Sequence, residues 1–231
     1  MRIPLAVAIL VINLAPLQAA DPFEFHGDRL MSTFTKGQER TELSGNAQIT
    51  SGDLVMKADT IELRGNGFRY VTCTGNVVVK DSKKNLLLMA DSMVYDRTLK
   101  LSRFSGRCEI DDPDQEVTVR AGLFDYDENA DTTTLQSGVR IFKGDLVCRS
   151  DFAIYNRKAD TLDMTGLPVV NKKTDEFHAG SIHVDLKTED VLLDGRVSGT
   201  ITPPPDKNKK PSDDSNSDDS KPDDATSKET P

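Results

Sequence analysis

Histidine and cysteine, the residues that most often serve catalysis and bind transition metals, are scarce in this chain of 231 residues. It contains three of each. His26, His178 and His183 include no pair at the spacing of a helical metal site, and the surrounding pattern indicates strand, so all three are expected on the surface. No catalytic arrangement of other residues is evident either. The sequence therefore predicts no enzyme activity, no cofactor and no metal site.

A hydrophobic run long enough to cross a membrane is also missing. The apolar run over residues 3–14 falls short of the roughly 20 residues that a transmembrane helix needs. It follows a single positive charge at Arg2 and precedes the small residues Ala19 and Ala20, an order typical of a cleaved signal peptide over 1–20. No cysteine near the cut could carry the lipid of a lipoprotein, so we expect a mature protein that is soluble outside the cytoplasm.

Residues 203–231 lack aromatic and large aliphatic side chains altogether. They open with three prolines and then repeat Asp, Ser, Lys and Pro. Such a segment cannot bury enough apolar surface to offset the entropy lost on ordering, which predicts a disordered acidic tail. Residues 21–202 remain, and their length fits one domain.

An excess of basic residues, which nucleic-acid binding would favour, is absent. The chain has a formal net charge of −9, and residues 21–202 alone hold 30 acidic and 23 basic side chains. This balance disfavours non-specific binding to phosphate backbones. We therefore expect no nucleic-acid partner.

What the sequence does contain is an internal repeat of about thirty residues. A small residue, a glycine position and an apolar-x-apolar run recur at anchor positions 45, 75, 106, 137, 166 and 195, which are spaced by 30, 31, 31, 29 and 29 residues. Ser137 takes the glycine position in the fourth copy, and the copy at Gly195 is truncated. A fixed period between 20 and 50 residues is typical of repeat architectures.

Apolar and polar residues alternate within each repeat, which is the period of a half-buried strand. In the second strand of the repeat, the apolar positions step once by three residues, for example from Ala58 to Ile61. The residue that would absorb this step is Asp59 in that copy, and the equivalent residues are Asp91, Gly122, Asp151 and Gly180. We expect a kink at the same place in every repeat of an elongated β solenoid, with exposed strand edges at both ends.

The recurring motif resembles the OstA-like repeat of the LptA/OstA family. The best matches are Gly75-Asn76-Val77 with Met89-Ala90-Asp91-Ser92-Met93-Val94-Tyr95, and Gly45-Asn46-Ala47 with Lys57-Ala58-Asp59. The resemblance covers residues 43 to about 199. It implies an all-β fold, a twisted V-shaped β jelly roll of five to six repeats, whose apolar interior accepts the acyl chains of lipopolysaccharide.

The same resemblance implies partners. Family members join end to end with an LptC-like inner-membrane protein, with an LptD-like outer-membrane protein and, head to tail, with copies of themselves. LptC keeps a membrane anchor and LptD continues into a large barrel, so LptA is the expected closest match. The implied function is transport of lipopolysaccharide or another glycolipid. The alternative from a different class is a structural solenoid, an envelope scaffold or adhesin-like module with a filled core.

The inward apolar positions are the candidate lipid site on this resemblance, although composition alone does not separate a lipid groove from a dry core. They are Met56, Ile61, Leu63, Leu88, Met93, Tyr95, Val119, Phe124, Tyr126, Tyr155, Phe177 and Ile182.

Charge is uneven along the chain. Residues 64–107 hold nine basic and three acidic side chains, and residues 109–131 hold nine acidic and one basic. This pattern fits a varied solvated surface, a means of setting subunit register, or contacts of basic side chains with a lipid phosphate. The candidate phosphate contacts are Arg69, Lys83, Lys84 and Arg103.

The three cysteines, Cys73, Cys108 and Cys148, occupy apolar positions of the repeat, where a small buried side chain is expected. With the repeats in register, the first two lie about 13 Å apart along the strand at roughly 3.3 Å per residue, too far for a disulfide. A bond to Cys148 stays open. The acidic group of Asp111, Asp112 and Asp114 is expected to form a solvated turn rather than a calcium site.

Overall fold

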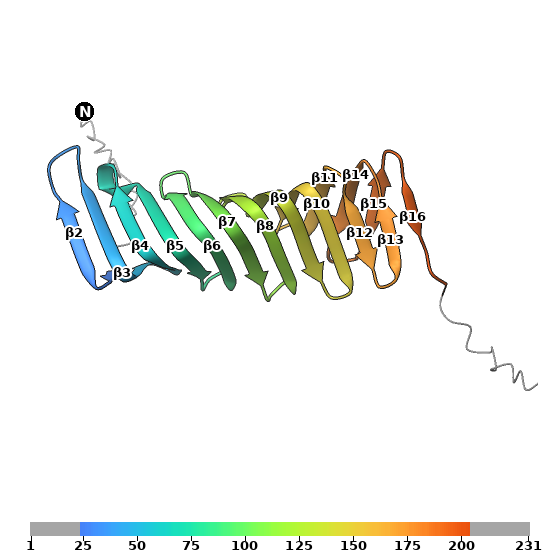
Figure 1. Ribbon diagram of the computed structural model, residues 1–231, viewed down its shortest axis with the longest axis horizontal. Helices are drawn as coiled ribbons and strands as arrows, with labels where there is room; N and C mark the ends of the chain where they lie inside the picture. The colour runs from blue at the N-terminus through green and yellow to red at the C-terminus, as the bar shows by residue number, and fades with distance from the viewer. Residues whose placement is uncertain (1–23, 204–231) are drawn as a thin grey trace, which may run out of the picture. The chain divides into compact units, whose positions relative to one another are not determined.

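The computed structural model describes residues 24–203, which form a single antiparallel sheet of 16 strands. The strands are β1 (Glu24–His26), β2 (Arg29–Thr33), β3 (Arg40–Ser51), β4 (Leu54–Arg64), β5 (Tyr70–Asp81), β6 (Leu86–Asp96), β7 (Leu101–Asp112), β8 (Val117–Asp127), β9 (Thr132–Lys143), β10 (Leu146–Asn156), β11 (Thr161–Thr165), β12 (Val169–Lys172), β13 (Asp175–His178), β14 (Ser181–Asp185), β15 (Val191–Asp194) and β16 (Ser198–Thr200). From β3 to β10, long strands follow one another in chain order along the long axis (Figure 1). The predicted all-β repeat fold is confirmed.

One short 3-10 helix, η1 (Asn66–Phe68), interrupts the strands of the described region. Within residues 24–203 no helix is long and apolar enough to span a membrane. The chain divides into two units, Met1–Ile201 and Thr202–Pro231, and the strands belong to the first. The expected signal peptide over 1–20, and the expected tail from residue 204 onward, lie outside the described residues.

A bulge interrupts each long strand near its middle. Between β5 and β6, Thr74 pairs with Ser92 and Val77 pairs with Ala90, so one extra residue lies on β5. The chain accommodates it at Gly75, where φ is 77°. In β9 the bulge residue is Ser137, which has a φ of 68°. This agrees with its place at the glycine position of the fourth repeat.

The kink lies at the predicted level of every repeat, but the prediction placed it on the wrong strand. The left-handed residues are those of the anchor, whereas Asp59 and Asp91 have no positive φ. Asp59 instead accepts hydrogen bonds from the Asn76 side chain at 3.1 and 3.2 Å. Its carboxylate also occupies the space that a Cβ on Gly75 would need. Glycine is therefore required there both by the backbone angle and by the packed aspartate.

The bulges divide the sheet into two walls, which become separate at its C-terminal end. Residues 146–149 of β10 pair with β12, and residues 152–156 pair with β11. The strands β12, β13 and β16 continue what we call wall A, and β11, β14 and β15 continue wall B. The N-terminal end is split in the same way, because β1 pairs with the wall A half of β3 and β2 with its wall B half.

The turns at the outer ends of the two walls form two rims. Rim A, at the end of wall A, comprises the turns at 52–53, 82–85, 113–116, 144–145 and 173–174. Rim B, at the end of wall B, comprises the turns at 65–69, 97–100, 128–131, 157–160 and 186–190. We call the line along which the rims face each other the seam.

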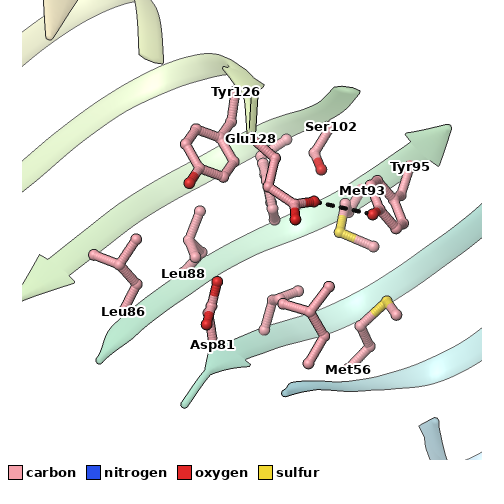
Figure 2. A pocket seen from close by; sticks show the side chains of 12 residues that line it. Met56, Asp81, Leu86, Leu88, Met93, Tyr95, Ser102, Tyr126 and Glu128 are labelled. Carbon is pink, nitrogen blue, oxygen red and sulfur yellow. Dashed lines mark hydrogen bonds between the residues drawn. The ribbon is translucent and has the colours of Figure 1, made fainter. Parts of the chain in front are cut away.

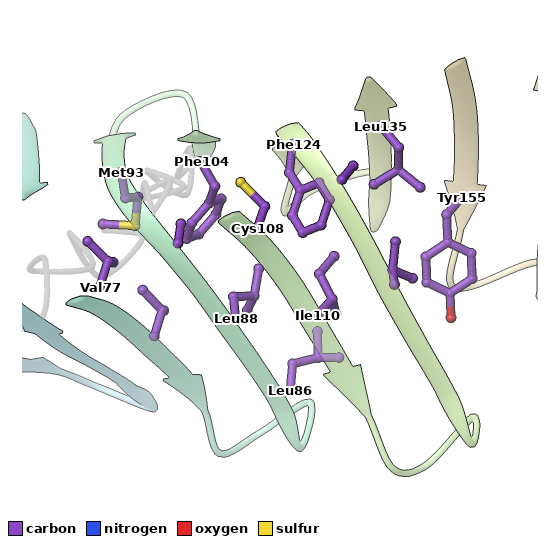
Figure 3. Close-up of a cluster of buried hydrophobic side chains, with 14 of the residues drawn as sticks. Val77, Leu86, Leu88, Met93, Phe104, Cys108, Ile110, Phe124, Leu135 and Tyr155 are labelled. Carbon is purple, nitrogen blue, oxygen red and sulfur yellow. The ribbon is translucent and has the colours of Figure 1, made fainter. Parts of the chain in front are cut away.

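The core lies between the inner faces of the two walls. Along β6 the burial pattern alternates with a single irregularity at the bulge, so Leu86, Leu88 and Met93 all point inward. They belong to one buried cluster with Phe104 of β7 and Phe124 of β8 (Figure 3). Each such side chain contributes about 1.5–3 kcal/mol when fully buried. Because each repeat buries its inner face only beside its neighbours, this core runs along the stack.

Candidate functional site: the interior and the rim cleft

The twelve inward positions predicted from the sequence all lie on the inner faces of the walls. Ten of them are at most 9% exposed, and Tyr126 and Phe177 are partly buried. The alternating pattern and the three-residue step therefore identified the inner face correctly. Whether these side chains contact a lipid is a separate matter, which depends on the space between the walls.

That space is largely filled by side chains. The interior cavity measures about 30 Å³ and is lined by residues of both walls, among them Met56, Leu88, Met93 and Tyr95 (Figure 2). A cavity of this size has room for about one water molecule. An acyl chain can therefore enter only if the two walls move apart.

A larger cleft opens directly above this cavity, between the two rims. It measures about 690 Å³. The cleft and the interior cavity share five lining residues: Leu54, Met56, Asp81, Tyr95 and Glu128. The apolar interior is thus continuous with a polar opening at this point of the seam. We call this opening the rim cleft.

Positive charge exceeds negative charge in the rim cleft, although the whole chain has a net charge of −9. Its charged lining residues are Arg69, Lys83, Lys84, Arg97 and Lys100 with Asp53, Asp81 and Glu128. The cations come from both rims: Lys83 and Lys84 from rim A, and the others from rim B. Because more cations than anions line the cleft, its electrostatic potential is positive and attracts anionic groups.

Hydrogen bonds hold several of these groups in place. Arg69 donates to both carboxylate oxygens of Asp96 at 2.6–3.0 Å, which lowers the pKa of Asp96. Tyr95 Oη donates to Glu128 Oε2 at 3.1 Å, and burial raises the pKa of this tyrosine. Lys100 Nζ lies 3.5 Å from Glu128 Oε1. The side chain of Lys83 is exposed.

The structure places three of the four predicted phosphate contacts, Arg69, Lys83 and Lys84, at the rim cleft. The fourth, Arg103, lies on the outer face of wall B, where it forms a two-pronged ion pair with Asp125 at 2.6 and 2.8 Å. The uneven charge along the chain is thus partly expressed as ion pairs between neighbouring strands. Sequence reasoning did not select Arg97 and Lys100, because the charge of residues 64–107 did not show which cations share a cleft.

Ion pairs join the two rims at three places within the described residues. Lys84 Nζ lies 3.0 Å from Asp131 Oδ1 and donates to Tyr126 Oη at 2.6 Å. Further along, Arg157 Nε donates to Asp112 Oδ2 at 2.7 Å. The third pair is Lys172 with Glu189, 2.5 Å apart. We call these contacts the cross-rim ion pairs.

Asp112 corrects the prediction of a solvated acidic turn. Its side chain is fully buried and also accepts a hydrogen bond from Tyr155 Oη at 3.4 Å. The period of two in β7, which turns Ile110 inward, also turns residue 112 inward. This alternation could have predicted that Asp112 is buried. The acidic neighbours Asp111 and Asp114 instead favoured the interpretation as a solvated turn.

The scarce residue types take no part in this site. His178 and His183 lie outside the core and contact Glu176 and Asp163, each at 2.7 Å. All three cysteines are free and buried; burial raises the pKa of Cys73 and Cys148 to about 12, so both thiols stay protonated at neutral pH. In residues 24–203, no group of three or more His, Cys, Asp or Glu side chains could hold a metal ion.

Both ends of the stack leave inward-facing apolar side chains uncovered. Phe25 of β1 pairs with the buried Ile49, and Leu30 of β2 pairs with the buried Leu43. Phe25 is 49% exposed and Leu30 is 45% exposed. At the other end, Phe177 of β13 is only partly buried. The inner surface therefore reaches the terminal strands on either side.

Comparison with known proteins identifies a family and several similar solved structures. Residues 66–190 match the family described as LptA/(LptD N-terminal domain) LPS transport protein. The crystal structure of LptH, the LptA homologous periplasmic component of the conserved lipopolysaccharide transport device from Pseudomonas aeruginosa, aligns with 11% sequence identity and a TM-score of 0.24, covering 79% of this chain and 96% of that chain. No curated protein matches the chain.

Proposed function

The chain belongs to the LptA/(LptD N-terminal domain) family of LPS transport proteins, and on that premise we propose that it is a periplasmic bridge for lipopolysaccharide or a related amphipathic lipid. The acyl chains would lie between walls A and B. The observation that supports this most directly is the continuity between the apolar interior and the polar rim cleft. An amphiphile requires both surfaces side by side. The protein would act by binding, without catalysing a reaction.

The inward side chains are suited to a replaceable occupant. Met56, Met93 and Met164 are flexible and adapt to irregular contacts. Lipid entry would exchange contacts between the two walls for contacts between each wall and an acyl chain, so the burial of apolar surface is largely retained. The cost is the separation of the rims, which the cross-rim ion pairs oppose.

The partners we propose are an LptC-like protein at the inner membrane, an LptD-like protein at the outer membrane and further copies of this chain. The uncovered apolar residues Phe25 and Leu30 support this, since they extend the inner surface to the N-terminal strands. Unpaired strand edges can add strands from another chain. Joined end to end, such units would extend a continuous apolar path.

A photo-crosslinking residue tests the lipid site. Placed at Met93, which is 2% exposed and faces the interior, it is expected to trap lipid in cells. At the adjacent Val94, which is 42% exposed and faces outward, it is not. The two positions differ by one residue and share the same strand, so local lipid concentration affects both alike. Mass spectrometry of the purified adducts would identify the cargo.

A structural solenoid with a filled core is the second candidate, favoured by the 30 Å³ interior cavity. It predicts no lipid adduct at Met93, or equal adducts at Met93 and Val94. Either result would contradict the transport proposal. The crosslink is chosen over a charge at Phe124 because that side chain is fully buried, and a carboxylate there would threaten folding under both proposals.

A further inference from the structure

We infer that the rim cleft is a lateral entry site, at which the phosphorylated headgroup of the lipid binds while its acyl chains pass sideways into the interior. This inference rests on the proposed function and adds to it a place and a headgroup chemistry. Loading would then occur through the seam as well as at the ends of the stack.

The cations of the rim cleft are arranged to meet an anion from two sides. Lys83 comes from rim A, and Arg97 and Lys100 come from rim B. Arg97 donates to the Gly67 carbonyl at 3.3 Å, which fixes its guanidinium at the cleft. Ammonium and guanidinium groups converging from two walls form charge-assisted hydrogen bonds with phosphate oxygens. A volume of about 690 Å³ lies within the range of small-molecule sites.

The apolar route begins at the floor of the same cleft. Leu54 and Met56 line both the cleft and the interior cavity, and so does Tyr95, near the rim B end of β6. Figure 2 shows Met56, Leu88 and Met93 lining the cavity, with Tyr95 and its hydrogen bond to Glu128 beside them. An acyl chain attached to a headgroup among the cations would thus meet apolar side chains directly beneath it.

Positive charge at the seam does not by itself define the site. A second cleft, of about 600 Å³, lies near Arg157 and contains the cations Lys143, Lys158 and Lys187. It shares no lining residue with the apolar cavity, and the buried pair of Asp112 with Arg157 closes the seam beside it. Of these two clefts, the rim cleft is the one that combines an excess of cations with access to the interior cavity.

The test compares two double variants with the same change of charge. Lys83→Glu with Lys100→Glu reverses one cation on each rim. Lys57→Glu with Lys80→Glu reverses two exposed cations on the outer face of wall A, on strands β4 and β5. Each protein is titrated with lipopolysaccharide in detergent and with the same lipopolysaccharide after phosphatase treatment. Inorganic phosphate at millimolar concentration serves as the competitor.

We expect the unaltered protein and the outer-face variant to bind the phosphorylated lipid about tenfold more tightly than the treated lipid. The rim variant should lose this preference but still bind the treated lipid. An unchanged preference in the rim variant would overturn the inference while leaving lipid transport intact. Displacement of the lipid by inorganic phosphate would instead indicate a free-phosphate site and overturn it too. If the unaltered protein binds neither lipid, the transport proposal fails and this inference fails with it.

A folding defect would not leave the result undecided. Circular dichroism checks each variant first, and the neutral pair Lys83→Gln with Lys100→Gln replaces any that is unfolded. The neutral pair should reduce the preference for the phosphorylated lipid about threefold. An unchanged preference in a folded neutral pair contradicts the inference in the same way.

Discussion

The seam differs between its two ends, although the same repeat builds both. Near β3 to β6 the rims leave a cleft of about 690 Å³ over the apolar cavity. From Lys84 onward, cross-rim ion pairs hold the rims together at Asp131, Asp112 and Glu189. The long strands repeat in both regions, so the difference between the regions lies in the rim turns and in the side chains at the strand ends.

Three tyrosines at equivalent positions make the comparison specific. Tyr95, Tyr126 and Tyr155 are the penultimate residues of β6, β8 and β10, next to rim B. Tyr95 donates to Glu128 on its own rim, whereas Tyr126 meets Lys84, and Tyr155 meets Asp112, both from wall A. The tyrosine is present in each of these repeats, and the seam is closed where the hydroxyl group of the tyrosine bonds to a residue of wall A. A repeat protein can thus vary access along its length without varying its fold.

The largest effect is expected from Asp112→Ala. This change leaves the Arg157 guanidinium, only 16% exposed, without its main partner, and it also removes the acceptor of Tyr155. Removal of one partner from a buried ion pair costs about 3 kcal/mol. The free energy of unfolding, measured by urea denaturation, should fall by about that amount.

Asp114→Ala provides the control for this change. Asp114 is 55% exposed and lies 3.8 Å from the same guanidinium, so its loss should cost less than about 1 kcal/mol. Equal losses in the two variants would show that the buried pair does not stabilise the closed part of the seam. The comparison of the two seam regions would then lose its energetic basis.

Lys84→Met should have an intermediate effect and move the boundary between the two regions. The methionine keeps the length of the side chain but loses the bonds to Tyr126 and Asp131, at a cost of about 1–2 kcal/mol. Amide hydrogen exchange should accelerate in the turns at 82–85 and 128–131, because the rims there are no longer joined. Lys83→Met, one residue away and exposed, should change stability by less than about 0.5 kcal/mol. Unchanged exchange in the Lys84 variant would mean that other contacts hold these rims together.

The sequence alone predicted the repeat, the inner face and the level of the bulge, because each depends on local periodicity. The period of two assigns every second residue to one face, and the single step of three marks the level at which the strand bends. The sequence did not show that the left-handed residues belong to the anchor strand. Asp59 and Gly75 are both plausible bulge residues, and only their mutual packing decides between them.

The contacts between the rims could not be predicted from local sequence patterns because they join distant parts of the chain. Arg157 donates to the Lys84 carbonyl across 73 positions and to Asp112 across 45. Such pairs depend on how the two walls fold onto each other, which no spacing in the sequence specifies. The cations of the cleft were recognised as a charge-rich stretch, yet Arg103 in the same stretch faces the outer side of wall B.

The smallest effect is expected from Asp96→Asn, which removes an ion pair within rim B. The hydrogen bond from Arg69 lowers the pKa of Asp96 in the folded protein below the unfolded value of about 3.9. The folded state therefore binds this proton less readily, so the stabilisation is present above about pH 4 and is lost as the pH falls through the folded pKa. Thermal melting should show the variant about 1–2 °C less stable at neutral pH, with the gap closing below about pH 4.

Asp53→Asn, which removes the same charge from an exposed turn of rim A at the same cleft, controls for the change in net charge. Because Arg69 and Asp96 lie on one side of the seam, the Asp96 variant should keep the exchange rates of the turns at 82–85 and 128–131, unlike the Lys84 variant. A gap in melting temperature that persists unchanged to pH 3 would show that Asp96 acts through its turn hydrogen bonds to Thr98 and Leu99 rather than through its charge. Faster exchange in those turns would show that a pair within one rim also governs the seam, and the distinction between the two regions would have to be abandoned.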